Sequence, residues 1–440
     1  MKPNKVICII MVFILLTFTT SCNVADMLLD RVSITGDNLI REVTEIKLGK
    51  HYSEVYPIPG EEAFLAYDFR YYDSIFAQLS KFDAAGSNLW TIDLSAYADR
   101  FHNRFTTYPN GSFIASLGRF IIKFDTNGNI EWERDFEYSP PRNIFTTETG
   151  DIIAVEDLEM FDSSAGFSPT DPNIRITKLD ASGNITIQKN FGGSDYEYTH
   201  SSFYTPETGL IIVGATQSVD GDFAITQPLS SENFIACINV DDMAVKWNLI
   251  SERKGSESTD LLFADTVTVA NGFVYTIVSS NHGNGITPSL IKLDSNGNRI
   301  WSTQLSSNLR FRSLSILSDG RILANTHSNS DDIYDAASGN SSLLWFDQDG
   351  NLLSELEGSG NLSGNITPTN DGGFFILFGR VLEILPSPPE VSRVSIDVAT
   401  DVMKFSKDNE LIWQKTYDNY QKSTIVDMVF PTDDGKLIIE

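Results

Sequence analysis

A phrase of the form Leu-x-Lys-Phe/Leu-Asp-x-x-Gly-Asn-x-x-Trp recurs along the chain with variations. Its aspartate, or the residue in that place, falls at Asp83, Asp125, Asp180, Asn239, Asp294, Asp347 and Ser406. These positions lie 42 to 59 residues apart, and short apolar runs and turn signals fill the intervals. A period near fifty built from such runs is typical of β-propeller blades and not of helical repeats. The repeat therefore predicts the architecture, but it does not say what the protein binds.

Each repeat unit carries two hairpin signals, which predict four antiparallel strands, named a to d from the propeller axis outward. In the first signal, a turn such as Asn110-Gly111 or Asp319-Gly320 separates two apolar runs. The second signal is the repeated phrase itself, in which Asn127-Gly128 separates two further runs. Asn-Gly between alternating apolar runs is the strongest short-range signal for a hairpin.

Seven complete units and two terminal half-units predict an eighth blade. At the C-terminus, 424–430 and 436–439 flank a turn and would supply strands a and b. Near the N-terminus, 32–40 mimics the repeated phrase with a serine in the aspartate position, and 42–48 would continue as an outer strand. We therefore expect an all-β, eight-bladed propeller over 32–440, closed by pairing of N- and C-terminal strands, which removes exposed sheet edges. Seven blades with a loose N-terminal strand is the alternative.

The first residues have the pattern of an export signal. Lys2 and Lys5 precede an apolar run at 6–16, which is too short to cross a bilayer. We expect residues 1–21 to be a signal peptide and 22–31 to be a short tether in front of the single propeller domain.

The end of this signal resembles the lipobox of bacterial lipoproteins, because the small residue Ser21 stands before Cys22. Thr19 departs from the motif, which prefers an aliphatic residue there. The resemblance implies cleavage after Ser21, lipidation of Cys22 by diacylglyceryl transfer, and acylation, as with palmitate, of the new amino terminus. It implies a lipid-anchored protein of the bacterial cell envelope, and Asn23 favours the outer over the inner membrane. Ordinary signal cleavage is the alternative.

The charge balance restricts the partners. The chain has 59 acidic and 32 basic residues and a net charge of −27. Such a charge argues against nucleic acid, whose affinity comes from cationic contacts to phosphates, and against electrostatic docking on anionic lipid. Beyond Cys8 and Cys22, Cys237 stands alone in an apolar run, so we expect no intrachain disulfide. The domain itself is expected to be monomeric.

Two further stretches carry resemblances. The segments 191–195 (Phe-Gly-Gly-Ser-Asp) and 218–222 (Ser-Val-Asp-Gly-Asp) resemble the tandem repeats of bacterial surface β-propeller lipoproteins, in the WD40-like and quinoprotein-like superfamily. The repeated phrase also resembles the tryptophan-docking motif of quinoprotein-like eight-bladed propellers. Here the hairpin is shorter, and Ile187 and Ser354 replace the tryptophan in two units. These resemblances imply a fold and carry little about activity.

The repeated aspartates and tryptophans can each be interpreted as structural residues or as ligand-binding residues. A calcium loop of the EF-hand type needs its glycine two residues later than 125–129 provides, so turn capping is favoured and calcium is a weak possibility. A residue that recurs once per blade is better explained by packing between blades than by stacking on a sugar. We expect this packing role for Trp90, Trp132, Trp247, Trp301 and Trp413. Trp345 replaces the usual lysine and is expected to be more exposed.

Catalysis receives little support from the sequence. The histidines are scattered, and no nucleophile elbow, phosphate loop or Cys-x-x-Cys is present. We therefore expect no catalytic residue, no resident metal and no cofactor. A propeller enzyme, either glycan-cleaving or quinoprotein-like, is the alternative to a non-catalytic scaffold.

The expected binding surface is the face that carries the b–c loops. These loops vary in length, and the long ones are predicted at 157–173, 216–232, 326–341 and 380–400. Variable loops on a rigid scaffold commonly form binding sites. The function expected is a scaffold that presents these loops to an unknown protein or glycan partner. The candidate contacts are Arg70, Tyr71 and Tyr72 in the first loop and Asp331, Asp332 and Tyr334 in the sixth.

The lipid anchor gives the first testable prediction. Cys22→Ala should abolish fatty-acid labelling and move the protein from the membrane to a soluble fraction, because the sulfur that would carry the diacylglyceryl group is lost. Cys8→Ala, within the signal, is the matched control and should leave labelling unchanged. Labelling that persists in Cys22→Ala would contradict the assignment.

Overall fold

The computed structural model describes residues 54–439 with internal gaps, of which the longest are 159–173, 226–231, 329–339, 360–365, 386–394 and 419–428. All regular elements in the described part are β-strands. The expected signal peptide, tether and N-terminal strands fall within residues 1–53 and lie outside the described part.

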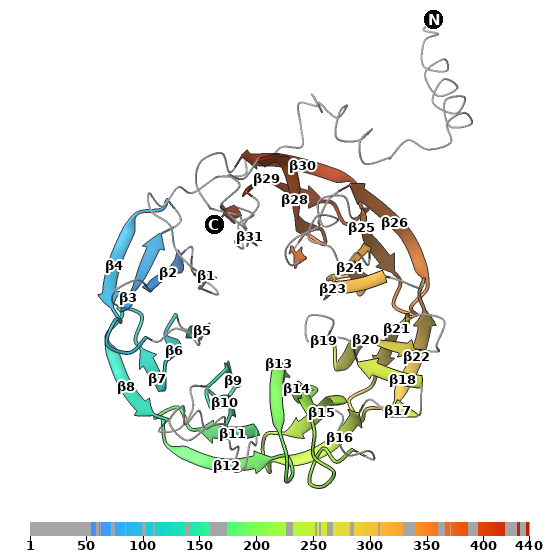
Figure 1. Ribbon diagram of the computed structural model, residues 1–440. Helices are drawn as coiled ribbons and strands as arrows, with labels where there is room; N and C mark the ends of the chain where they lie inside the picture. The colour runs from blue at the N-terminus through green and yellow to red at the C-terminus, as the bar shows by residue number, and fades with distance from the viewer. Residues whose placement is uncertain are drawn as a thin grey trace, which may run out of the picture.

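Seven sheets stand around a central axis as the blades of a propeller (Figure 1). Blade 1 contains β1 (Glu54–Pro57), β2 (Ala63–Tyr71), β3 (Ile75–Asp83) and β4 (Asn88–Asp93). Blade 2 contains β5 (Asn103–Thr107), β6 (Phe113–Leu117), β7 (Phe120–Phe124) and β8 (Ile130–Asp135). Blade 3 contains β9 (Asn143–Thr146), β10 (Ile152–Asp157), β11 (Ile174–Leu179) and β12 (Ile185–Phe191). Blade 4 contains β13 (Glu197–Thr205), β14 (Gly209–Thr216), β15 (Glu232–Asn239) and β16 (Ala244–Ile250).

The remaining blades vary slightly on this plan. Blade 5 contains β17 (Arg253–Lys254), β18 (Glu257–Leu261), β19 (Val267–Ala270), β20 (Phe273–Asn281), β21 (Ile286–Leu293) and β22 (Arg299–Gln304), and its strand a is divided into β18 and β19, which both pair with β20. Blade 6 contains β23 (Leu309–Ile316), β24 (Ile322–Ser328), β25 (Asn340–Phe346) and β26 (Leu352–Ser359). Blade 7 contains β27 (Thr367–Pro368), β28 (Phe374–Leu385), β29 (Ser395–Phe405) and β30 (Leu411–Asp418).

The core lies between the blades, because each hydrophobic cluster joins two successive sheets. Leu65 and Leu79 of blade 1 pack with Phe113 and Phe124 of blade 2, and five comparable clusters join the later pairs up to blades 6 and 7. Strand b is therefore buried along its length, as in β6 and β10. Strand d on the rim exposes every second residue, as in β4, β8 and β22.

The number of blades corrects the main expectation. The described residues form seven blades, which confirms the alternative of seven and not the expected eight. The C-terminal strands β31 (Val429–Pro431) and β32 (Leu437–Ile439) form a two-stranded sheet between blades 7 and 1, where β31 contacts β27 and β1 (Figure 1). Three-residue strands share few ladder bonds, and the segment expected to complete this sheet, 32–48, lies outside the described residues.

Tryptophans of the repeated phrase dock one blade onto the next. The Trp132 indole on β8 lies against Gly183 in the c–d turn of blade 3, where an added Cβ atom would come within 2.8 Å of the ring. The Trp132 Nε1 donates to the Ala181 carbonyl oxygen at 3.1 Å. The same two contacts recur for Trp90 with Gly128 and the Thr126 carbonyl, Trp247 with Gly297 and the Ser295 carbonyl, and Trp301 with Gly350 and the Gln348 carbonyl. Trp413 instead meets Phe375 of its own blade, with ring centroids 6.5 Å apart.

Two blade junctions replace the tryptophan and the glycine together. Between blades 3 and 4, Ile187 packs in the cluster that contains Met243, which takes the glycine position with a φ of 54°. Between blades 6 and 7, the Arg321 guanidinium donates to the Lys407 carbonyl and, at 2.7 Å, to Asn409 Oδ1. Asn409 holds the glycine position there with a φ of 64°. A side chain larger than glycine is thus accommodated where no indole covers the turn.

Trp345 was expected to be exposed, and that expectation is wrong. Its side chain is only 3% exposed and packs between blades 6 and 7, against Phe374 and Phe405. The lysine position on strand c faces the next blade, so an indole there joins the core.

The repeated aspartates cap their own turns. Asp125 Oδ1 accepts from the Asn127 and Asn129 amides at 2.8 and 2.9 Å, and its Oδ2 accepts from Asn129 Nδ2 at 2.9 Å. The hydrogen bonds from the Asn129 side chain and amide lower the pKa of Asp125, and Asp180, Asp294 and Asp347 repeat the arrangement. The carboxylate oxygens therefore serve the backbone of the turn, which is the turn interpretation of the motif.

The tryptophan–glycine contact is tested by Gly183→Ala with Gly150→Ala as its matched control. The two glycines have φ values of 81° and 83°, so alanine carries the same backbone strain at both. At Gly150 the nearest atom to a new Cβ is 3.8 Å away, whereas at Gly183 the Trp132 ring is 2.8 Å away. We expect Gly183→Ala to lose about 1–3 kcal/mol more free energy of unfolding than Gly150→Ala in urea melts, because the indole is displaced. Equal losses would show that the indole does not depend on this glycine.

Candidate functional site

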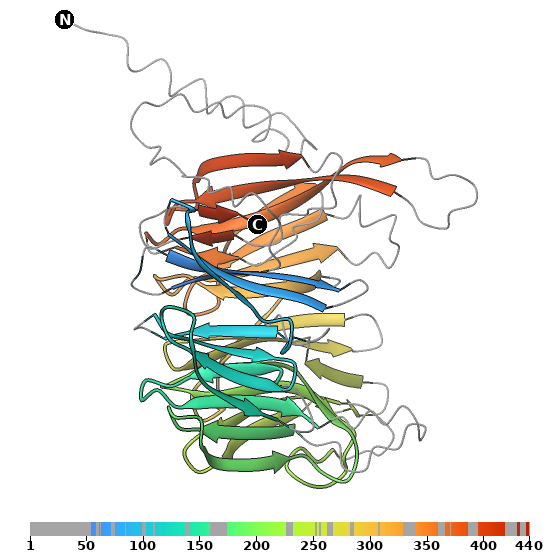
Figure 2. The same ribbon diagram turned by 90° about the vertical axis from the view of Figure 1, so that its left-hand side faces the viewer.

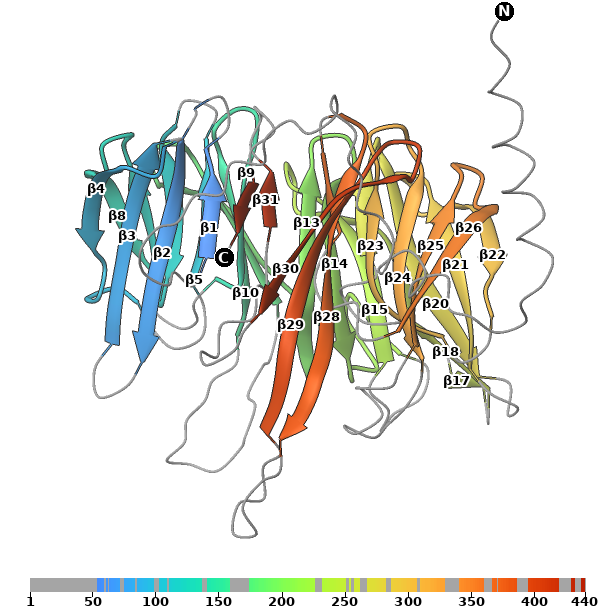
Figure 3. The same cartoon turned by 90° about the horizontal axis from the view of Figure 1, so that it is seen from above.

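The two faces of the ring differ in their connections. The a–b and c–d turns lie on one face, called the turn face, and the b–c and d–a connections lie on the other, called the loop face (Figure 3). Seen from the side, the β28–β29 hairpin reaches beyond the other blades on the loop face (Figure 2). The ring therefore presents one regular surface and one irregular surface.

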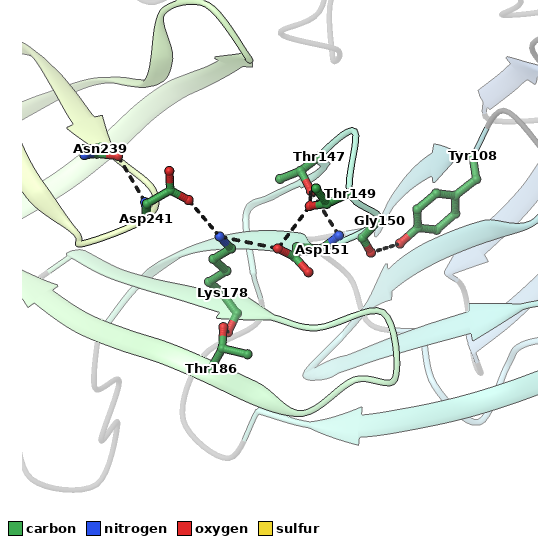
Figure 4. A network of polar contacts seen from close by, with 9 residues as sticks. All are labelled: Tyr108, Thr147, Thr149, Gly150, Asp151, Lys178, Thr186, Asn239 and Asp241. Atoms are coloured by element: carbon green, nitrogen blue, oxygen red, sulfur yellow. Dashed lines mark hydrogen bonds and ion pairs between the residues drawn. The ribbon is translucent and has the colours of Figure 1, made fainter.

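The polar side chains of the turn face are engaged with one another. Lys178 Nζ lies 3.4 Å from Asp151 Oδ2 in its own blade and 3.1 Å from Asp241 Oδ1 in blade 4 (Figure 4). The Tyr108 hydroxyl of blade 2 donates to the Gly150 carbonyl of blade 3 at 3.1 Å. The contacts of Lys178 with Asp241 and of Tyr108 with Gly150 join neighbouring blades, as the tryptophans do.

The lysine of the repeated phrase also fixes the a–b turn within its own blade. Lys81 donates to Glu61 Oε2 at 2.7 Å, and Lys404 donates to Asp371 Oδ2 at 2.6 Å. Burial raises the pKa of Asp371, but hydrogen bonds from Lys404, the Thr369 hydroxyl and a backbone amide outweigh it and lower the pKa to about 2. These charged side chains of the turn face therefore stabilise the fold through ion pairs within a blade.

On the loop face, the structure places only part of the predicted contact set. The Arg70 side chain is 49% exposed and donates from Nε and Nη2 to the two Asp68 oxygens, both at 2.9 Å. Tyr71 is the last residue of β2 and pairs with Ile75. Tyr72, and the sixth-loop residues Asp331, Asp332 and Tyr334, lie outside the described residues.

One predicted loop is largely strand. Residues 380–400 were expected to be a b–c loop, but β28 continues to Leu385 and β29 begins at Ser395. The apolar runs on both sides of 386–394 pair with each other, as Val381 does with Val398. The loop was predicted from its length alone, whereas the alternating apolar residues within 380–400 indicate that the two strands continue.

Buried ion pairs lie at the loop-face end of blade 3. Glu156, fully buried on β10, accepts from Arg175 Nε at 2.9 Å and from the Thr177 hydroxyl at 3.2 Å. Burial raises the pKa of Glu156, although the Arg175 bonds act in the opposite direction. Beside it, Asp157 Oδ2 lies 2.6 Å from Arg142 Nε. Sequence reasoning missed these pairs, but two acids directly after the apolar run of β10 were a usable signal.

Asp157 extends this network into the next blade. Its Oδ1 accepts from both the amide and the hydroxyl of Thr199 on β13, at 3.0 and 2.9 Å. Arg142 Nη1 donates to the Thr199 carbonyl at 3.1 Å. Blades 3 and 4 are therefore joined by a polar network, the polar base, at their loop-face ends.

Above this base, two segments form a single locked unit, which we call the blade-4 double loop. It consists of 192–196, which enters β13, and 217–225, which follows β14. The Ser194 amide donates to Asp220 Oδ1 at 2.7 Å, and the Asp195 amide donates to Ser218 Oγ at 2.9 Å. A Cβ atom at Gly221 would lie 2.0 Å from the Gly192 carbonyl oxygen, so the two segments touch through their backbones.

A buried carboxylate supports the double loop from below. Glu197 accepts from the Gly193 amide at 3.2 Å and from the Thr216 hydroxyl at 2.9 Å. Burial raises the pKa of Glu197, and hydrogen bonds from Ser218, the Gly193 amide and Thr216 counteract it. The Gly-Gly-Ser-Asp and Ser-Val-Asp-Gly-Asp stretches singled out by resemblance thus meet in space.

Three other observations bear on the chemistry available. Burial raises the pKa of the Cys237 thiol to about 11, so it stays protonated and unreactive near neutrality. Among the described residues, no group of three or more His, Cys, Asp or Glu side chains is arranged to hold a metal ion. The same part of the chain contains no helix long and apolar enough to cross a membrane.

Comparisons with known proteins give similarity of overall fold. No family model and no curated protein matches the sequence. A solved structure described as the eukaryotic initiation factor shares 9% identity at a TM-score of 0.48, over 83% of this chain and 78% of that one. The Dos1 propeller shares 8% identity at 0.47, over 88% and 92%. The WD40 domain of SCAP from fission yeast shares 8% identity at 0.44, over 84% and 85%. Similarities this low give no information beyond the fold that the strand order already shows. The function therefore has to be argued from the residues of the chain.

Because Glu156 and Arg175 form a buried pair, we expect substitution of Arg175 to lower the free energy of unfolding much more than substitution of an exposed arginine. Arg175→Met leaves Glu156 buried without its partner and should cost about 3–5 kcal/mol of unfolding free energy. Arg119→Met, which removes an exposed pair with Asp135, should cost about 1 kcal/mol or less. Removal of Arg175 raises the pKa of Glu156 further, so the cost should shrink as the pH falls and Glu156 becomes protonated. Equal costs for the two variants, or a cost independent of pH, would contradict this account.

Proposed function

We propose that the protein is a non-catalytic scaffold that binds a protein or glycan partner through its loop face. The observation that carries this proposal is the contrast between the two faces. On the turn face, the repeated Asp, Lys and Trp side chains form bonds within and between blades. On the loop face, connections of unequal length stand on a rigid polar base. Rigid elements that carry variable loops are the usual construction of binding surfaces.

The proposed location is the bacterial envelope, with the propeller held at the membrane by lipid on Cys22. This part rests on the sequence of residues 1–22 and on the resemblance of the repeats to surface lipoproteins. With a tether of about ten residues at 22–31, roughly 18 Å in root-mean-square length for a flexible chain, the loops would act close to the bilayer. The net charge of −27 favours a basic partner, or a glycan held by hydrogen bonds.

The enzyme alternative has less support from the described residues. Glu156 and Asp157 are the buried carboxylates closest to an arginine, and both are held by hydrogen bonds to side chains of the fold. A general acid or base needs access to a substrate proton, which these carboxylates do not have.

The binding role is tested by capture of partners from envelope extract, divided into protease-treated and untreated portions. Tyr71→Ala/Tyr72→Ala on the loop face should reduce capture at least about tenfold, because aromatic side chains carry much of the energy of interfaces. The control is Leu89→Ala/Ile300→Ala, which removes two exposed apolar side chains from the outer strands. Capture that survives protease treatment identifies a glycan. Equal capture by the loop variant and the control would contradict a binding site at this loop.

A further inference from the structure

The blade-4 double loop carries an exposed apolar side chain that the fold does not need. Seven large apolar side chains are strongly exposed in the described part of the chain. Six of them lie at the start of rim strands, just after the c–d turns: Leu89, Ile130, Ile185, Ile300, Leu352 and Leu353. The seventh, Val219, is 51% exposed on the loop face, between Ser218 and Asp220. Its position does not follow from the repeat, which distinguishes Val219 from the six rim residues.

The loop that presents Val219 is held in one conformation. The neighbouring residue Ser218 is fixed by two hydrogen bonds. Its hydroxyl accepts from the Asp195 amide, and its carbonyl accepts from the Ile225 amide at 2.8 Å. The Asn248 side chain of β16 fixes the same loop through the Asp222 carbonyl at 2.8 Å. An apolar side chain on a preordered loop binds at a lower entropic cost than one on a mobile loop.

Aromatic rings continue from the double loop down the innermost strand. Tyr196, immediately before β13, and Tyr198 and His200 within β13 occupy alternate positions and are half-buried. The ring centroids of Tyr196 and Tyr198 are 5.4 Å apart, and those of Tyr198 and His200 are 4.8 Å apart. β13, which carries Tyr198 and His200, is the strand of blade 4 nearest the axis (Figure 1). Tyrosine rings offer a face on which a guanidinium stacks.

The charge around these side chains is negative. Asp195 and Asp220 are exposed in the double loop, and Asp222 lies beside them. The arginines of the adjoining blade are already committed, since Arg175 pairs with Glu156 and Arg142 pairs with Asp157. The surface therefore combines an aliphatic contact, aromatic faces and carboxylates, and this combination is complementary to arginine next to apolar side chains.

We propose that the blade-4 patch, defined as Asp195, Tyr196, Tyr198, Val219 and Asp220, binds an extended segment of a partner protein in which arginine alternates with apolar residues. The inference rests on the proposed scaffold function and specifies its partner. Arginine stacks on the tyrosines and meets the Oδ2 atoms of Asp195 and Asp220, whose Oδ1 atoms accept from the Tyr196 and Ser194 amides. An adjacent apolar side chain covers Val219. A peptide fits this patch better than a glycan does, because a sugar has no aliphatic side chain to place on Val219.

The test uses a short synthetic peptide in which arginine and leucine alternate, with binding measured by fluorescence anisotropy. The control peptide has citrulline, a neutral analogue of the same shape, in place of arginine. We expect saturable binding of the arginine peptide, at least about tenfold weaker binding of the citrulline peptide, and weakening by added salt. No binding of the arginine peptide, or equal binding of both peptides, would overturn the proposal.

Matched variants assign the binding to the patch. In Asp195→Asn/Asp220→Asn, the side-chain oxygens can still accept from the backbone amides of the loop. This variant and Val219→Ser should each weaken binding at least about tenfold, or about 1.4 kcal/mol. Ile185→Ser on the rim and Asp349→Asn on the turn face remove equivalent exposed groups and should leave binding within about twofold. Losses of the same size in the two control variants would overturn the assignment to the blade-4 patch.

The same variants separate this inference from the scaffold function. In the envelope capture experiment, Val219→Ser should lose the partner together with the Tyr71→Ala/Tyr72→Ala variant. Loss in the tyrosine variant alone would refute the blade-4 patch and leave the scaffold function standing. Unchanged capture in both would refute the scaffold function. Capture of a glycan that survives protease treatment and is lost in Val219→Ser would refute the choice of a peptide.

Discussion

The fold depends on the contact between an indole and a glycine of the next blade. Trp132 lies on Gly183 and donates to the Ala181 carbonyl, and three other tryptophans repeat this pair of contacts. The glycine has to lack a side chain for two reasons, its φ of 81° and the closeness of the ring. The hydrophobic clusters also lie between blades, so this contact and the clusters together join the blades at four junctions of the ring.

The exceptions follow the same constraint. Where Ile187 replaces the indole, Met243 replaces the glycine, and where Arg321 takes over the donor role, Asn409 stands in the turn. Each of the six junctions from blade 1 to blade 7 has a side chain that packs with or bonds to the next turn, so the turn face is occupied along these blades. We therefore propose the loop face for binding, where Glu156 and Asp157 pair with Arg175 and Arg142 at the end of blade 3.

The propeller and its strands could be predicted from the sequence because the repeated phrase encodes both a hairpin and a blade junction. The blade number was harder, because it depends on short terminal strands such as β31, which pair through three residues only. The exposed position expected for Trp345 was wrong, since the identity of a residue does not show which neighbour covers it. The blade-4 double loop was visible as a motif, but the meeting of 192–196 and 217–225 depends on a tertiary contact between the d–a and b–c connections.

The central claim is that the turn face holds the ring together and the loop face binds. Site-specific photo-cross-linking in intact envelopes tests this most directly, with a benzophenone amino acid in place of Val219 on the loop face or of Asp349 on the turn face. Both positions are exposed, so reactivity depends only on what lies beside each face. The account predicts a discrete cross-linked partner from the Val219 position and none above background from the Asp349 position. A partner that cross-links from Asp349 and not from Val219 would contradict it.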